Sequence, residues 1–156
     1  MTIPAWLGWM LVALPCAAAP VCKCVSPGVE ELFARSEMVF TGTVLQVGTL
    51  GPPAADPRYP ASRAADGVGA LTQPVTFRLT RAWKGGGADT VTVGNPYLSC
   101  GPSFQPGTEY MVYAVHSEYG GLATAGCWRT REFSRLPWDG IDDVPILDSI
   151  VRRTGR

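Results

Sequence analysis

The sequence has no excess of charge of either sign. Its 13 basic residues balance its 13 acidic residues, so the formal net charge is zero at pH 7. Proteins that bind nucleic acids or anionic membranes usually carry a basic patch or stripe, and no such patch stands out along this chain. The charge balance therefore argues against a nucleic-acid partner and against an anionic membrane surface.

The residue patterns that support catalysis are also missing from the sequence. The one histidine, His116, falls in an expected strand, and no pair of carboxylates has a recognisable catalytic spacing. The glycine run after Lys84 is not followed by the Gly-Lys-Ser/Thr of a phosphate-binding loop. We therefore do not expect an enzyme, and we expect no cofactor.

The first 19 residues contain no charged side chain. Residues 5–14 form an apolar run, and residues 17–19 are the small alanines that a signal peptidase requires. These features predict a signal peptide at residues 1–19, cut after Ala18 or Ala19, and export to an extracellular or periplasmic location. The alternative is an uncleaved membrane anchor, but the apolar run is broken by prolines and is barely long enough to span a bilayer.

Removal of the leader also removes Cys16 and leaves four cysteines. An even number of cysteines in an exported chain favours two disulfides. Cys22 and Cys24 are two residues apart, where a direct bridge has poor geometry, so each is expected to pair with Cys100 or with Cys127, in either of two arrangements. A four-cysteine zinc site is the less favoured alternative, because such sites usually use Cys-x-x-Cys pairs.

The remaining chain, residues 20–156, is about 137 residues long, which suffices for one domain with a hydrophobic core. Apolar alternation and β-branched residues predict strands at residues 38–47, 75–80, 90–93, 109–116 and 122–125. Both faces of residues 109–116 are apolar, so this strand is expected to be central. Gly42, inside the first strand, predicts a bulge or bend.

Helical spacing of apolar residues predicts a short helix opened by Ser26 and Pro27, and a C-terminal helix after Asp142 and Asp143. Residues 48–73 are dense in Pro, Ala and Gly and form an unusually long connection, which we expect to be a flexible loop rather than a functional one. The predicted fold is mainly β: a five-stranded OB-fold barrel with a short N-terminal helix and a C-terminal helix, stapled by disulfides.

Several short motifs follow one another along the chain, and they are Cys22-Lys23-Cys24 with the helix and strand after it, Lys84-Gly85, Ser99-Cys100-Gly101, Gly107-Thr108-Glu109-Tyr110 and Cys127. In this order they resemble the netrin-like module, and most of all the N-terminal domain of the tissue inhibitors of metalloproteinases. The resemblance covers nearly all of residues 20–156 and implies an OB-type barrel with the disulfides Cys22–Cys100 and Cys24–Cys127. Those inhibitors usually carry a third disulfide and a separate C-terminal domain. We expect neither here, as in the shorter bacterial members that the chain resembles.

The resemblance also implies a mode of action. In the family, the first cysteine is the mature N-terminus, and its amino group and carbonyl oxygen chelate the catalytic zinc of the target protease. By position, Cys22 would chelate and Lys23 would enter the specificity pocket. The inhibitory ridge carried over by position comprises Cys22, Lys23, Cys24, Val25, Ser26, Leu98 and Ser99. We therefore expect a secreted, monomeric inhibitor of a zinc metalloendopeptidase.

The zinc-binding role depends on where the mature chain begins. A cut after Ala18 or Ala19 leaves residues ahead of Cys22, and an acylated nitrogen cannot donate a lone pair to zinc. Metal binding by Cys22 is thus expected only if Cys22 is the mature N-terminus. The alternative function is an extracellular netrin-like binding module that keeps the stapled fold and has no protease-inhibitory activity.

Overall fold

The computed structural model describes residues 25–64, 66, 70–97, 100–124, 126–137 and 140–155. The predicted signal peptide and the Cys22-Lys23-Cys24 motif lie outside these residues. Within the described ranges, no helix combines the length and the hydropathy that crossing a membrane requires.

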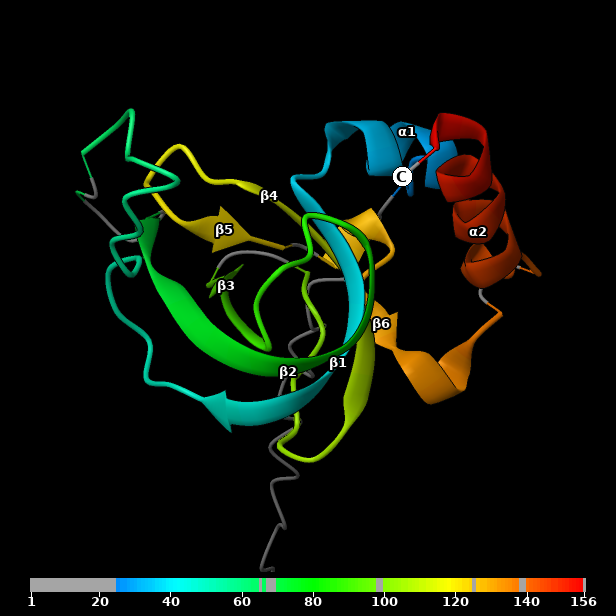
Figure 1. Ribbon diagram of the computed structural model, residues 1–156. Coiled ribbons are helices and arrows are strands. Elements are labelled where there is room, and N and C mark those ends of the chain that lie inside the picture. Colours follow the sequence, from blue (N-terminus) through cyan, green and yellow to red (C-terminus); the bar gives the residue numbers. More distant parts are fainter. Residues whose placement is uncertain are drawn as a thin grey trace, which may run out of the picture.

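Five strands form a closed barrel (Figure 1). They are β1 (Met38–Val47), β2 (Thr72–Lys84), β3 (Thr90–Pro96), β4 (Glu109–His116) and β5 (Leu122–Ala123). Their order around the barrel is β1-β2-β3-β5-β4, and β1 closes it by pairing with β4. The β3–β5 pair is parallel, while the other neighbours are antiparallel. A short strand β6 (Arg131–Glu132) also pairs with β4. The expectation of a mainly β chain with a five-stranded barrel is confirmed.

The strand pattern of the sequence located β1 and β4 at their observed ends. Five consecutive residues at the centre of β4 are buried, as expected for a strand with two apolar faces. The register of β1 on β2 shifts between Thr41 and Gly42. A Cβ atom at Gly42 would lie 2.9 Å from the carbonyl oxygen of Arg78. The predicted bend at Gly42 is therefore confirmed, and close backbone approach is its physical reason.

Strand β2 begins earlier than the sequence indicated. Its first three residues are Thr72, Gln73 and Pro74, whereas the sequence predicts a strand from Val75 and places Thr72 and Gln73 in the loop at residues 48–73. Pro74 lies opposite Gly94 on one side, and on the other its carbonyl oxygen accepts a hydrogen bond from Gly48 N at 2.7 Å. Gly48 follows the last residue of β1, so the missing N–H of Pro74 costs the β1–β2 ladder nothing.

Two helices lie side by side outside the barrel (Figure 1). Helix α1 (Val29–Arg35) begins two residues after the predicted Ser26-Pro27 start, with Gly28 as its N-cap. Helix α2 (Asp143–Thr154) confirms the predicted C-terminal helix and begins one residue earlier, at Asp143, with the Asp142 side chain accepting from Val144 N. The apolar faces of both helices share a second core with the outside of the barrel, whose buried members are Val29, Leu32, Phe33, Val39, Trp83, Met111, Tyr113, Leu147 and Ile150.

The long connection between β1 and β2 runs beside the β4–β5 turn (Figure 1). The N–H of Gly121 donates to the carbonyl oxygen of Tyr59 at 2.8 Å. His116 Nε2 lies 2.9 Å from the carbonyl oxygen of Pro60. These bonds give the described part of residues 48–73 a defined path, while the flexibility of this loop stays a prediction.

Candidate functional site

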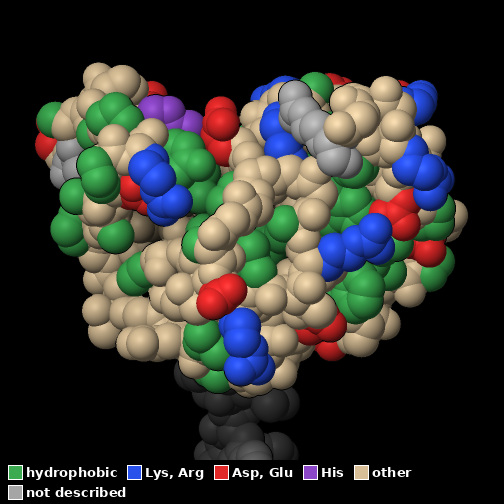
Figure 2. Space-filling model, viewed as in Figure 1, with side chains coloured by type: hydrophobic (Ala, Val, Ile, Leu, Met, Phe, Trp, Pro, Cys, Tyr) green, Lys and Arg blue, Asp and Glu red, His purple; other side chains and the backbone are tan. Residues whose placement is uncertain are grey.

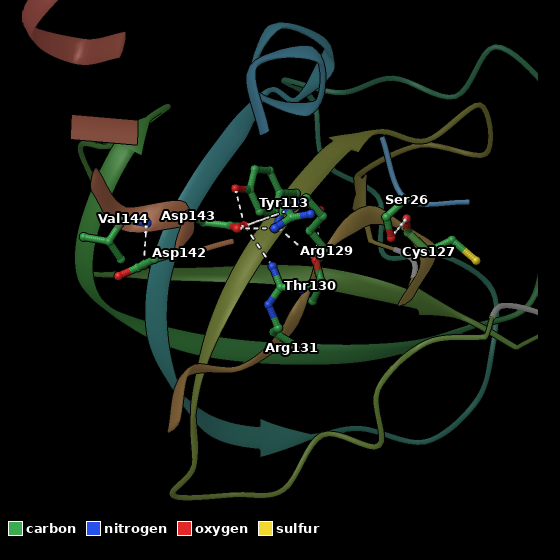
Figure 3. A network of polar contacts seen from close by, with 9 residues as sticks. All are labelled: Ser26, Tyr113, Cys127, Arg129, Thr130, Arg131, Asp142, Asp143 and Val144. Carbon is green, nitrogen blue, oxygen red and sulfur yellow. Dashed lines mark hydrogen bonds and ion pairs between the residues drawn. The ribbon is translucent and has the colours of Figure 1, made fainter. Parts of the chain in front are cut away.

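The structure describes two residues of the predicted inhibitory ridge, Val25 and Ser26. Val25 is 93% exposed. The Ser26 hydroxyl donates to the carbonyl oxygen of Cys127 at 3.2 Å, across 101 positions of sequence (Figure 3). The segment that follows Cys22-Lys23-Cys24 therefore lies against the short 3-10 helix η2 (Gly126–Trp128). The other predicted ridge residues lie outside the described residues, and they are Cys22, Lys23, Cys24, Leu98 and Ser99.

The two downstream cysteines occupy different surroundings. Cys100 is exposed, and Cys127 is half-buried in η2. Both are disulfide-bonded and so do not titrate as thiols. Their predicted partners, Cys22 and Cys24, lie outside the described residues, so the pairing Cys22–Cys100 and Cys24–Cys127 stays a prediction.

The segment after Cys127 is held to the barrel by a cluster of polar side chains around Asp143, which we call the Asp143 cluster (Figure 3). Asp143 is the first residue of α2 and is fully buried. Arg129 Nε donates to both carboxylate oxygens of Asp143, at 3.2 and 3.0 Å, and its Nη2 also bonds to Oδ1. Arg131 Nη2 and the Tyr113 hydroxyl each donate to Oδ2 at 2.8 Å. One carboxylate thus joins the start of α2, strand β4 and the chain that leaves η2.

Burial shifts the pKa values of two members of the Asp143 cluster, Tyr113 and Arg131. It raises the pKa of Tyr113 far above the ordinary value, and the Asp143 charge adds to that effect. The Tyr113 hydroxyl therefore remains a donor at any physiological pH. Burial also lowers the pKa of Arg131, while the Asp143 carboxylate opposes that shift. The side chains of Arg129 and Arg131 are only 3% and 11% exposed, so their attraction to Asp143 is weakly screened.

The backbone at Arg129 is also unusual. Its φ of 59° lies in the left-handed region, which non-glycine residues seldom adopt. On its C-terminal side, the Thr130 hydroxyl accepts from the Tyr113 N–H at 3.0 Å and lies 2.6 Å from the Thr124 hydroxyl. The residues just after Cys127 are therefore bonded to β4 through the Thr130 side chain and to the start of α2 through the Arg129 side chain.

Sequence reasoning missed the Asp143 cluster. It identified Asp143 only as part of a helix start, because an Asp-Asp pair ahead of an apolar repeat favours a solvent-exposed cap. Arg129 and Arg131 are two residues apart just after Cys127, so in an extended chain they lie on the same side. This spacing was a weak signal that both side chains point into the protein. Nothing in the local pattern indicates that Asp143 turns into the protein while Asp142 stays at the surface.

An exposed aromatic residue directly precedes Leu98 in the sequence. Tyr97 is 58% exposed, and the nearby Leu50 is 42% exposed. Together with Gln73, Asn95 and Pro96 they line a cleft of about 300 Å³. Sequence reasoning did not single out Tyr97, although its position beside a predicted ridge residue was a usable signal. This apolar surface adjoins the point where the chain enters Leu98-Ser99-Cys100.

No charged centre comparable to a metal site appears among the described residues, where no group of three or more His, Cys, Asp or Glu side chains could hold an ion. On the face shown in Figure 2, acidic and basic side chains are interspersed rather than gathered into a patch of one sign. A comparison with protein-family models found no match, and a comparison with curated proteins also found none.

Proposed function

We propose that this chain is a secreted netrin-like module, similar to the tissue inhibitors of metalloproteinases, that inhibits a zinc metalloendopeptidase through a disulfide-held N-terminal ridge. The hydrogen bond between Ser26 and Cys127 carries the proposal. It fastens the segment that follows the Cys-x-Cys motif to a half-cystine far along the chain, while Val25 beside it stays exposed. A ridge with this function needs both properties, a fixed backbone and an accessible surface.

The order of strands supports an OB-fold as the scaffold of this proposal. An OB-fold is a five-stranded Greek-key barrel. Here β3 does not pair with its neighbour in sequence, β4, but with β5, and β4 returns to close the barrel on β1. This crossing of strands is what distinguishes a Greek-key barrel from a simple meander.

The proposed mechanism uses zinc that belongs to the protease. A free amino group and the carbonyl oxygen of Cys22 would take the coordination positions that the protease offers to its catalytic water. Lys23 would then point into the specificity pocket. Because the disulfides and the Ser26–Cys127 bond hold the segment before binding, little conformational entropy is lost on association. The Asp143 cluster contributes by fixing the turn that carries Cys127.

The proposed pairing of cysteines has its own support and test. The pairing proposed is the one that the family resemblance implies, Cys22–Cys100 and Cys24–Cys127. The contact of Ser26, two positions after Cys24 in the sequence, with Cys127 supports it. Peptide mapping without reduction should recover these two bridges, and removal of either should cost about 2–5 kcal/mol of stability. Recovery of a Cys22–Cys127 peptide would refute the pairing.

The decisive experiment compares mature forms that differ only at the N-terminus. Protein that begins at Cys22 should inhibit a zinc endopeptidase, while protein that begins at Ala19 or Pro20 should inhibit far more weakly. The reason is that a free amine, with a pKa of about 8, can offer its lone pair to zinc and an amide nitrogen cannot. Acetylation of the Cys22 form should abolish inhibition. Lys23→Ala, the control, should change selectivity among proteases and keep zinc-dependent inhibition.

Two outcomes would redirect the proposal. Equal inhibition by the trimmed and extended forms would rule out chelation by Cys22. No inhibition by either form, across several zinc endopeptidases, would favour the binding module. The exposed pair Tyr97 and Leu50 is the observation that supports this second function, since exposed tyrosines are frequent energetic centres of protein interfaces and need no free N-terminus.

A further inference from the structure

A cleft of about 330 Å³ lies between the β1–β2 loop and the seam where β3 meets β5. One wall is formed by the loop, including Ala54, Asp56 and Arg58. The opposite wall is the β4–β5 turn, and Thr90 and Thr92 of β3 line the cleft between them. The two walls are fastened together by the Gly121–Tyr59 backbone bond described above, so the cleft is formed before any ligand arrives.

The barrel is least tightly joined at this seam. Strand β3 pairs with β2 along its whole length, from Thr90 to Pro96. With β5 it shares a single paired position, Gly94 with Ala123. The chain reaches β5 through Gly120 and Gly121, whose φ values of 94° and 70° are in the left-handed region. Among the described residues, no strand pairs with β3 before Gly94 on the side opposite β2.

The hydrogen-bond register shows which groups of β3 this leaves open. The Gly94 carbonyl oxygen accepts from Thr124 N at 2.9 Å, so the peptide groups of Gly94 face β5 and not β2. Backbone groups alternate in direction along a strand. The N–H and C=O groups of Thr92 and Thr90 therefore point to the same side as those of Gly94, into the cleft. Among the described residues, no backbone hydrogen bond uses them on that side.

The cleft thus presents two backbone donors and two backbone acceptors, repeated about every 7 Å along a strand. Small residues such as Ala54 and Ala123 leave room for another backbone to approach β3. The charges in the cleft, Asp56 and Arg58, are paired with each other at 2.8 Å. Such a surface matches an uncharged extended peptide better than a nucleic acid or another strongly charged ligand.

We propose that this cleft binds an extended, uncharged segment of a partner protein, which adds to β3 as a further strand. Main-chain hydrogen bonds supply the affinity in strand addition, and pockets for alternate side chains supply the specificity. The walls are formed largely by alanine, glycine, serine and threonine, which leave room for the side chains of the added strand. This site goes beyond the N-terminal ridge and does not require protease inhibition.

The test is a selection from a phage-displayed library of seven-residue peptides, followed by titration of the selected peptide into isotope-labelled protein. The amide signals of Thr90 and Thr92 should shift, and their hydrogen exchange should slow. Thr92→Pro removes an N–H that the β2–β3 ladder does not use, and it should weaken binding about tenfold or more. Thr92→Val, the matched control, keeps the N–H and loses only the hydroxyl, which bonds to Thr76 at 3.0 Å. It should bind within about twofold of the original protein, because a surface substitution of this kind usually has a small effect.

Three results would overturn the proposal. One is equal peptide binding by the Thr92→Pro protein, and another is a set of shifted amides that excludes Thr90 and Thr92. The third is that the library yields no peptide while the protein binds a neutral oligosaccharide such as chitohexaose, and that Thr92→Val abolishes this binding. That result would show that the cleft recognises the hydroxyl groups of an oligosaccharide. If Thr92→Pro does not fold, slowed exchange at Thr92 in the original protein decides between the same alternatives.

Discussion

Replacement of Asp143 by asparagine tests the energetic role of the Asp143 cluster. The change keeps the shape of the side chain and removes the negative charge that Arg129, Arg131 and Tyr113 share. The side chains of Arg129 and Arg131 are both largely buried, with exposures of 3% and 11%. Water therefore cannot replace the lost carboxylate effectively.

The expected loss follows from this burial. Removing one partner from a buried ion pair typically costs about 3–5 kcal/mol, a large part of the roughly 5–15 kcal/mol that stabilises an average domain. With a urea dependence of about 1–3 kcal/mol per molar for small proteins, the unfolding midpoint of Asp143→Asn should fall by at least about 1 M. Urea titration followed by tryptophan fluorescence measures this shift.

A surface pair in helix α1 is the matched control. Glu31 and Arg35 are 3.2 Å apart, and both side chains are more than half exposed. Glu31→Gln also converts a carboxylate to an amide at an ion pair, and it should cost about 0.3–0.5 kcal/mol. A measured loss for Asp143→Asn no larger than that of Glu31→Gln would refute the inference that this cluster holds α2 and the Cys127 turn to the barrel.

Three further predictions concern other parts of the fold. The free energy of unfolding should fall as pH rises above about 10, by up to about 1.4 kcal/mol per pH unit, because the folded state retains the Tyr113 proton that the unfolded chain releases. Urea unfolding of Tyr113→Phe should show no such dependence on pH, and an unchanged dependence would contradict the assignment to Tyr113. Gly85→Ala should lower the melting temperature more than Gly107→Ala. Both glycines have left-handed backbones, but only at Gly85 would the new Cβ lie 2.5 Å from a carbonyl oxygen. Equal losses would show that backbone strain alone determines the effect of these substitutions. Trp83→Phe should cost about 1–3 kcal/mol, since Trp83 Nε1 donates to the Asp148 carboxylate at 2.6 Å, and a double-mutant cycle with Asp148→Ala that gives no coupling would exclude this bond as the cause.

Local patterns in the sequence determined most of the secondary structure of this protein. The β-branched residues along 38–47 and the two apolar faces of 109–116 located β1 and β4, because both are local features that require no knowledge of the partner strand. Gly42 marked the bend in β1 for a similarly local reason. The sequence likewise indicated both helices, although the first begins at Val29 rather than at Ser26-Pro27.

The tertiary structure alone decided how these elements meet. Closure of β1 on β4, the single β3–β5 pairing and the inclusion of Pro74 in β2 depend on strands distant in sequence, which local periodicity cannot report. The same is true of the candidate sites. The sequence supplied Ser26 and the cysteines of the predicted ridge, but only the fold brings Ser26 to Cys127, 101 positions away. It also turns Asp143 inward and leaves Asp142 outside, because the burial of a charge depends on oppositely charged partners that other elements supply.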